Sequence, residues 1–150
     1  MAWRRITEAD ILTRISATEL DAFRSLLLGD GQEDPVDYYI DQVTDLARGS
    51  IAGNPANLLG AAGTIPQKLL GPCVDMIVIE IMKRCGGVLI DPNDARKEAA
   101  RTAMQLLQRV ERGLFAIEEP LEKSDEAHGI PSPSISGSTA RFRRDQQDGI

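Results

Sequence analysis

Residues 73–84 read Cys-Val-Asp-Met-Ile-Val-Ile-Glu-Ile-Met-Lys-Arg, and this stretch decides the fold. Its apolar side chains would occupy almost all sides of a helix, which is typical of a helix surrounded by others. Val78 and Ile79 would also suit a β-strand. A helix is favoured because the charged residues do not alternate as one strand face requires, and no hairpin partner lies nearby. We therefore expect the central helix of an all-α domain, ending at Gly86-Gly87.

Capping residues and helix breakers divide the rest of the chain into further helices. Asp34-Pro35 and Asp91-Pro92 are typical helix starts, because aspartate accepts a hydrogen bond from the first turn and proline suits the first helical position. Thr7 and Thr18 are expected to cap two shorter helices. Gly71-Pro72 should kink or divide the helix that restarts at residue 66, since proline lacks the amide hydrogen. The chain is predicted to form a small bundle of about five helices, starting near residues 8, 19, 35, 66 and 92 and ending near residues 15, 28, 51, 86 and 113.

A long connection separates the third and fourth predicted helices. Residues 53–65 contain few bulky apolar side chains, and loops of this length inside a compact domain are often functional. The simpler interpretation is a flexible inter-helix loop. The more specific one is a contact with another subunit through Asn54, Leu58 and Leu59.

The composition changes after Pro120. The following residues are rich in Gly, Pro and Ser and lack the bulk to bury themselves. We therefore predict a helical domain over residues 1–120 and an extended or disordered tail over residues 121–150 that docks on a partner. Arginine and aromatic residues are enriched in interface cores, and they recur near the end of this tail. The expected docking residues are Ile135, Arg141, Phe142, Arg143 and Arg144.

Composition limits the class of protein. The chain has 150 residues, the size of one domain, and 42% of them are hydrophobic, enough to fill a single core. Its formal net charge of -6 disfavours tight binding to nucleic-acid phosphates. Cys73 and Cys85 would lie about 18 Å apart along one helix, too far for a disulfide, so free thiols and synthesis in a reducing cytosol are expected. No membrane span and no signal peptide are recognisable.

Catalytic and cofactor-binding signatures are not recognisable. The only histidine, His128, lies in the predicted tail, away from partners that would complete a catalytic or metal-binding set. The glycine-rich residues 53–63 lack the Gly-Lys-Ser/Thr ending of a phosphate-binding loop. We therefore expect no enzyme activity, no cofactor and no metal.

An acidic row marks the third predicted helix. Asp37, Asp41 and Asp45 recur every four residues, which places them on one helix face. Carboxylates can bind calcium or magnesium, but a solvated acidic face is the more frequent outcome, and no EF-hand pattern accompanies them. The row is expected to face solvent, a basic partner or a DNA conduit.

The fifth predicted helix is basic on its polar sides. Glu98 is placed to pair with two of these charges, as on an ordinary helix surface. The remaining charge suits either the DNA backbone or the acidic third helix of a neighbouring subunit, a heterologous contact that can build a ring. The basic residues are Arg96, Lys97, Arg101, Arg109 and Arg112.

The order of these elements resembles the small head-tail connector proteins of tailed phages, and more narrowly the Mu-like prophage connector family. The likeness covers roughly residues 4–120. It rests on the opening Ile6-Thr-Glu-Ala-Asp-Ile-Leu12, a helix from Asp34-Pro35, a long linker into Ile65-Pro66, and a final helix that ends at Gly113.

The resemblance implies a structural protein of the virion neck, made in the host cytoplasm. A typically twelve-fold homo-oligomeric ring would sit beneath the portal protein, complete the head and present a surface to a tail or neck protein. DNA would pass through the ring without sequence-specific binding, along a wall formed by the acidic third helix, and the tail would dock on the portal. The alternative from the residues is a small nucleic-acid-binding or regulatory module that uses the basic fifth helix.

Overall fold

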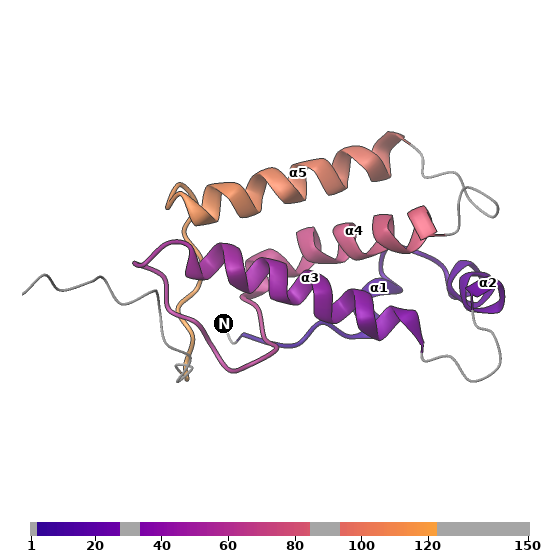
Figure 1. Ribbon diagram of the computed structural model, residues 1–150, viewed down its shortest axis with the longest axis horizontal. Helices are drawn as coiled ribbons and strands as arrows, with labels where there is room; N and C mark the ends of the chain where they lie inside the picture. Colours follow the sequence, from indigo (N-terminus) through magenta and orange to yellow (C-terminus); the bar gives the residue numbers. More distant parts are fainter. Residues whose placement is uncertain (1–2, 28–33, 85–93, 123–150) are drawn as a thin grey trace, which may run out of the picture.

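The structure is a computed structural model that describes residues 3–27, 34–84 and 94–122 (Figure 1). Within these ranges the chain is helical, apart from loops and one isolated β-bridge, so the predicted all-α bundle of five helices is confirmed. The tail predicted over residues 121–150 lies outside the described residues, except for its first two positions. The helices are α1 (Glu8–Ile11), α2 (Ala17–Leu27), α3 (Pro35–Ala52), α4 (Gln67–Arg84) and α5 (Asp94–Glu111).

Helix α4 is the central helix, as its sequence predicts. It packs against α3, α5 and α1, and α3 and α5 also pack against each other. Leu69, Cys73 and Ile77 are fully buried along it. Burial of one large apolar side chain contributes roughly 1.5–3 kcal/mol, so the all-round apolar surface of α4 makes it the main source of core stability.

Helix α4 continues through Pro72, so of the two predicted outcomes, a kink or a division, the division does not occur. Proline lacks the N–H that would bond the carbonyl of Lys68, so one helical hydrogen bond is lost near the beginning of the helix. Lys68 is exposed, and water can satisfy its carbonyl. The missing helical hydrogen bond therefore costs little stability at this position.

The helix starts are partly as predicted. Asp34 accepts a hydrogen bond from the Val36 amide at 3.0 Å, with Pro35 as the first residue of α3. The predicted cap of α2 by Thr18 is wrong. Ser16 takes that role, because its Oγ accepts from the Glu19 amide at 3.2 Å while the Glu19 carboxylate accepts from the Ser16 amide at 2.8 Å. This reciprocal pair satisfies two amides, whereas Thr18 already lies inside the helix.

Helix α5 ends at a glycine, as predicted. Gly113 has a φ of 72°, a conformation that residues with a Cβ rarely adopt. Its amide donates to the Val110 carbonyl at 3.0 Å, and the Leu114 amide reaches back to the Arg109 carbonyl at 2.8 Å. This pair of bonds is the Schellman motif, and it turns the chain away from the helix axis.

Three segments that are distant in the sequence meet at one end of the bundle. The Arg4 amide and carbonyl pair with those of Ile65, both at 3.0 Å, so the N-terminal strand-like segment lies beside the loop before α4. The indole of Trp3 donates to the Glu118 carbonyl at 2.8 Å. The residues after α5 thus return to the beginning of the chain (Figure 1), and Trp3 and Pro120 both lie next to Gly60 of the loop.

Candidate functional site

Groups that could support catalysis or metal binding are few in the described part of the chain. Within the described ranges no group of three or more His, Cys, Asp or Glu side chains is placed to hold a metal ion. Cys73 is buried, and burial raises the pKa of its thiol to about 12. Cys73 is therefore a protonated core residue, because the thiolate is disfavoured away from water. Cys85 and His128 lie outside the described residues. No helix that the structure describes is long and apolar enough to cross a membrane.

The acidic row lies on the exposed side of α3. Asp37, Asp41 and Asp45 are all exposed, and none forms an ion pair with another residue in the described part of the chain. Tyr38 and Leu46 on the same helix are also exposed, by 61% and 43%. The outer surface of α3 therefore combines uncompensated negative charge with apolar side chains.

Most of the basic residues are exposed on α5, but Arg96 is not one of them. Lys97, Arg101, Arg109 and Arg112 are exposed, and Arg101 pairs with Glu98 at 3.1 Å, the local pairing expected from the sequence. The basic surface is thus spread along the length of the helix.

The prediction that Arg96 belongs to a free basic face is wrong. Its guanidinium lies 3.3 Å from the Glu19 carboxylate of α2 and 3.4 Å from the Arg14 carbonyl, to which it donates. The Ser16 amide and this guanidinium together hold the pKa of Glu19 below its usual value. Arg96 therefore attaches α2 to the beginning of α5, a role that only the packing of these helices reveals.

The loop over residues 53–65 is closed onto its own chain. Arg48 of α3 is only 7% exposed and donates to the carbonyls of Ala61 and Thr64, both at 2.9 Å, and of Gly60 at 3.3 Å. One guanidinium can satisfy several carbonyls because its donors form a planar fork. Hydrogen bonds from Arg48 therefore attach this loop to α3.

The three loop residues that were predicted to contact another subunit differ in their burial and in their contacts. Leu59 is only 7% exposed and belongs to the hydrophobic core, so its assignment to a contact with another subunit is wrong. Leu58 is half-buried. Asn54 accepts from the Ala56 amide at 3.0 Å and lies next to Gly113. The loop uses its apolar bulk to close the core of its own chain.

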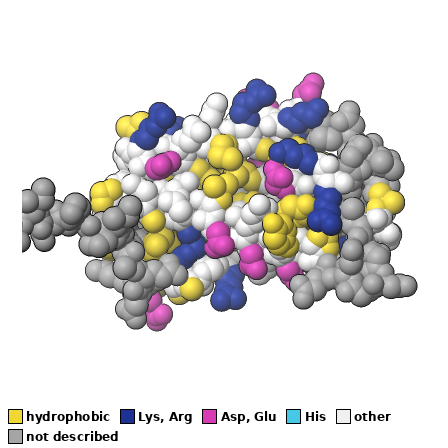
Figure 2. Space-filling model, in the orientation of Figure 1, with side chains coloured by type: hydrophobic (Ala, Val, Ile, Leu, Met, Phe, Trp, Pro, Cys, Tyr) yellow, Lys and Arg dark blue, Asp and Glu magenta, His cyan; other side chains and the backbone are white. Residues whose placement is uncertain are grey.

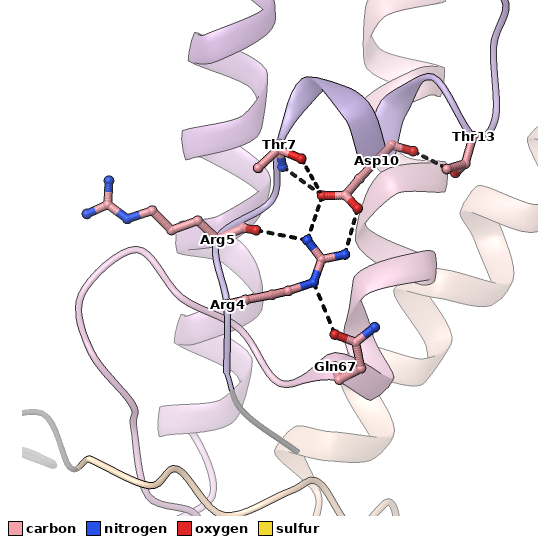
Figure 3. A network of polar contacts seen from close by, with 6 residues as sticks. All are labelled: Arg4, Arg5, Thr7, Asp10, Thr13 and Gln67. Atoms are coloured by element: carbon pink, nitrogen blue, oxygen red, sulfur yellow. Dashed lines mark hydrogen bonds and ion pairs between the residues drawn. The ribbon is translucent and has the colours of Figure 1, made fainter.

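A polar cluster at the beginning of the chain contains Thr7, the predicted cap of α1, together with Arg4, which the sequence did not single out. The Arg4 guanidinium binds both carboxylate oxygens of Asp10, at 2.6 and 2.9 Å, and its Nε donates to Gln67 at 3.1 Å (Figure 3). The Thr7 amide and hydroxyl donate to the same carboxylate at 2.9 and 2.8 Å. The hydrogen bonds from Arg4 and Thr7 lower the pKa of Asp10 to about 2, although burial opposes this. The cluster joins the N-terminal segment to the first turn of α4.

Further ion pairs tie the N-terminal helices to the three-helix core. Arg24 of α2 bonds the Glu8 carboxylate at 2.7 Å and the Asp34 carboxylate that caps α3, also at 2.7 Å. Arg14 pairs with Asp75 of α4 at 3.0 Å. The pKa of Asp75 is nevertheless raised, because burial outweighs the attraction of Arg14. Each pair links residues from different elements, so charge pattern along the sequence could not identify it.

A groove of about 560 Å³ runs between α4 and α5. Small side chains line it on α5, including Ala95 and Ala99, and Pro72 and Asp75 line it on α4. Among the described residues its lining comes from α4 and α5, without a side chain of α3. The groove is therefore separate from the acidic row.

The expected docking residues of the tail, Ile135, Arg141, Phe142, Arg143 and Arg144, lie outside the described residues. A scan against models of protein families gave no match. Comparisons with curated proteins and with solved structures also gave no significant match. The surface features that remain are the charged and apolar side chains of α3 and α5.

Proposed function

We propose that this chain is a structural subunit of the head-tail connector of a tailed phage. In this role it forms a ring beneath the portal protein, completes the head and presents a surface to a tail or neck protein in the virion. It acts through contacts with other proteins, and DNA passes through the ring without sequence-specific binding. The C-terminal tail binds the portal.

The order of the helices carries this proposal. Short α1 and α2 precede α3, which starts at Asp34-Pro35, and a long connection then leads through Ile65-Pro66 into the buried α4. Helix α5 ends at Gly113. The sequence likeness to connector proteins rests on the same succession of elements. The acidic row of α3 supports the proposal further, because negative side chains on a channel wall repel DNA and let it slide.

Electron microscopy of the purified full-length chain, alone and with a portal protein from a tailed phage, tests the proposal. With the portal present, we expect a complex in which a ring of the chain caps one end of the portal ring. A parallel sample that lacks residues 123–150 should bind the portal more weakly, because it lacks the proposed docking residues. The absence of both rings and a portal complex at micromolar concentration would refute the connector role.

A second function is favoured by the exposed polar side of α5. Arg101, Gln105, Gln108 and Arg112 are exposed, and such side chains can contact base edges or phosphates when a helix enters the major groove. Duplex-DNA binding measured over a range of salt concentrations separates the two functions. Affinity that falls steeply with salt supports the nucleic-acid-binding module, whereas the connector proposal predicts weak binding to free DNA.

A further inference from the structure

The outer face formed by α3 and α5 combines three kinds of side chain. Figure 2 shows Lys and Arg side chains over α5, acidic side chains along α3 and hydrophobic side chains between the two helices. Met104 on α5 and Leu46 on α3 are exposed to a similar extent, by 40% and 43%. An apolar centre with a charged rim is the usual anatomy of a protein–protein interface.

The two apolar residues lie on helix edges that face each other. Gly53, just after α3, is so close to Glu111 at the end of α5 that a Cβ on Gly53 would be 2.8 Å from the Glu111 Cγ. Leu46 precedes Gly53 by seven residues, and Met104 precedes Glu111 by seven. Seven residues are about two helical turns, so Leu46 and Met104 lie on these same edges. Each helix therefore contributes an exposed apolar side chain to this outer face.

The charged residues flank this centre with opposite sign. Lys97 and Arg101 are exposed along α5, and Asp41 and Asp45 are exposed along α3. Helices α3 and α5 contact each other, meet near their C-terminal ends and diverge toward their N-terminal ends (Figure 1). Figure 2 shows charged side chains over both helices on one face of the molecule. A ring contact requires complementary patches on different sides of a subunit, whereas complementary rows on one face suit a two-fold contact.

We propose that the α3/α5 face is the interface of a two-fold symmetric homodimer of the free chain. A two-fold axis parallel to the helices places the basic row of each copy opposite the acidic row of the other. The same operation brings the two apolar centres into contact. An axis across the helices would instead oppose like charges, which disfavours that arrangement.

The dimer covers the acidic row that the connector proposal assigns to a channel wall. It is therefore a state of the chain before assembly, and the dimer itself does not depend on the connector role. Leu46 and Met104 become buried in it, which accounts for two of the large apolar side chains that the monomer leaves exposed. Charged rows that meet across the rim set the register and the orientation.

Sedimentation equilibrium of the full-length chain without any portal protein tests the dimer. We expect the wild type to associate no further than a dimer, and to dissociate as salt is raised, because exposed charges are screened. The variants Asp41→Lys with Asp45→Lys, and Lys97→Glu with Arg101→Glu, should each weaken self-association at least about tenfold at low salt. Asp21→Lys, an exposed charge reversal on α2, serves as the matched control and should leave the dimer unchanged.

Mixing the two reversed proteins provides the decisive measurement. The reversed α3 row of one protein then faces the reversed α5 row of the other, so a heterodimer should form more tightly than either variant associates with itself. Circular dichroism confirms that each variant is folded. A monomeric wild type, a dimer that charge reversal does not weaken, or species larger than a dimer would each overturn the proposal. A monomer that still binds the portal refutes only the dimer, and a dimer that binds no portal refutes only the connector role.

Discussion

At the scale of residues, two arginines attach loop and terminal segments to the rest of the domain. Arg48 closes the loop before α4, and Arg4 joins the N-terminal segment to the same region. Neither residue has a sequence signal that separates it from a surface arginine. Arg4 binds an acceptor that is distant in the chain, Gln67. Arg48 binds carbonyls that come within its reach only after the loop has folded.

Replacing Arg48 by methionine should destabilise the protein. The substitution keeps the apolar stem but leaves the carbonyls of Gly60, Ala61 and Thr64 without this donor. Loss of partners for buried polar groups costs roughly 1–3 kcal/mol each when water cannot replace them, so we expect about 2–4 kcal/mol. Urea unfolding followed by circular dichroism measures it. Arg112→Met, on the exposed side of α5, should change stability by less than about 0.5 kcal/mol, and an equal effect of both variants would contradict the role of Arg48.

Asp10 should make stability depend on pH in the acid range. Its folded-state pKa is about 2, below the ordinary 3.8, so the folded protein holds this proton less tightly than the unfolded chain. The stabilisation is present above about pH 4 and is lost as pH falls toward 2. Because Arg4 is partly exposed, we expect about 1 kcal/mol.

The variant Asp10→Asn isolates this contribution. It should be less stable than the wild type at neutral pH, and the difference should shrink as pH falls from about 4 to about 2. Thermal unfolding at a series of pH values measures the difference. Asp21→Asn changes an exposed carboxylate instead and should show no such convergence; a constant difference for Asp10→Asn across the range would contradict the ion pair.

At the scale of elements, the helices begin and end where local chemistry directs. Asp34 caps α3 as its sequence predicts, and Gly113 ends α5. Before α2, two residues that can cap a helix, Ser16 and Thr18, lie two positions apart. Ser16 is selected because Glu19 can complete a reciprocal pair with it, whereas the residue three positions after Thr18 is Asp21, whose side chain remains exposed.

Two glycines allow a matched comparison of helix interior and helix end. Gly49 lies within α3, and a Cβ added there would have no atom within 4 Å, so Gly49→Ala should stabilise the protein by roughly 0.5–1 kcal/mol. Gly113 has a φ of 72°, and a Cβ there would lie 3.1 Å from the Asn54 Nδ2. Gly113→Ala should therefore destabilise it by about 1 kcal/mol. Chemical denaturation compares the two variants, and stabilisation by both would contradict the left-handed cap.

At the scale of the whole molecule, the residues after α5 form part of the folded domain. Phe115 and Ile117 pack against the core, and Glu118 accepts the Trp3 indole hydrogen bond. The domain boundary predicted near residue 120 remains a prediction, since the structure describes the chain only as far as residue 122. The contacts of this returning segment make a truncation series informative.

A chain ending at Glu122 should keep its thermal stability, whereas a chain ending at Gly113 should lose about 2 kcal/mol or more, because Phe115 and Ile117 no longer cover the core. Differential scanning calorimetry of both truncations against the full chain measures this. The first truncation serves as the control for removal of residues 123–150. Global unfolding of the chain that ends at Glu122 would contradict the predicted domain boundary.

Local sequence patterns predicted the helical class, most helix limits and the central position of α4, because periodicity and capping act within a few residues. It also located the exposed acidic row of α3, since a four-residue spacing defines a face. Only the tertiary structure decided which charges remain on the surface. Arg96 and Arg48 are engaged by partners from other segments, while Lys97 and Asp41 stay exposed.

Packing between distant segments also explains why Leu59 is buried and why the charged rows of α3 and α5 share one face. A loop leucine becomes a core residue only when Arg48 closes the loop beneath the N-terminal segment. The acidic and basic rows become parts of one surface only because α3 and α5 pack next to each other on α4. Local sequence sets the form of each element, and long-range packing sets which of its side chains meet another element and which meet solvent.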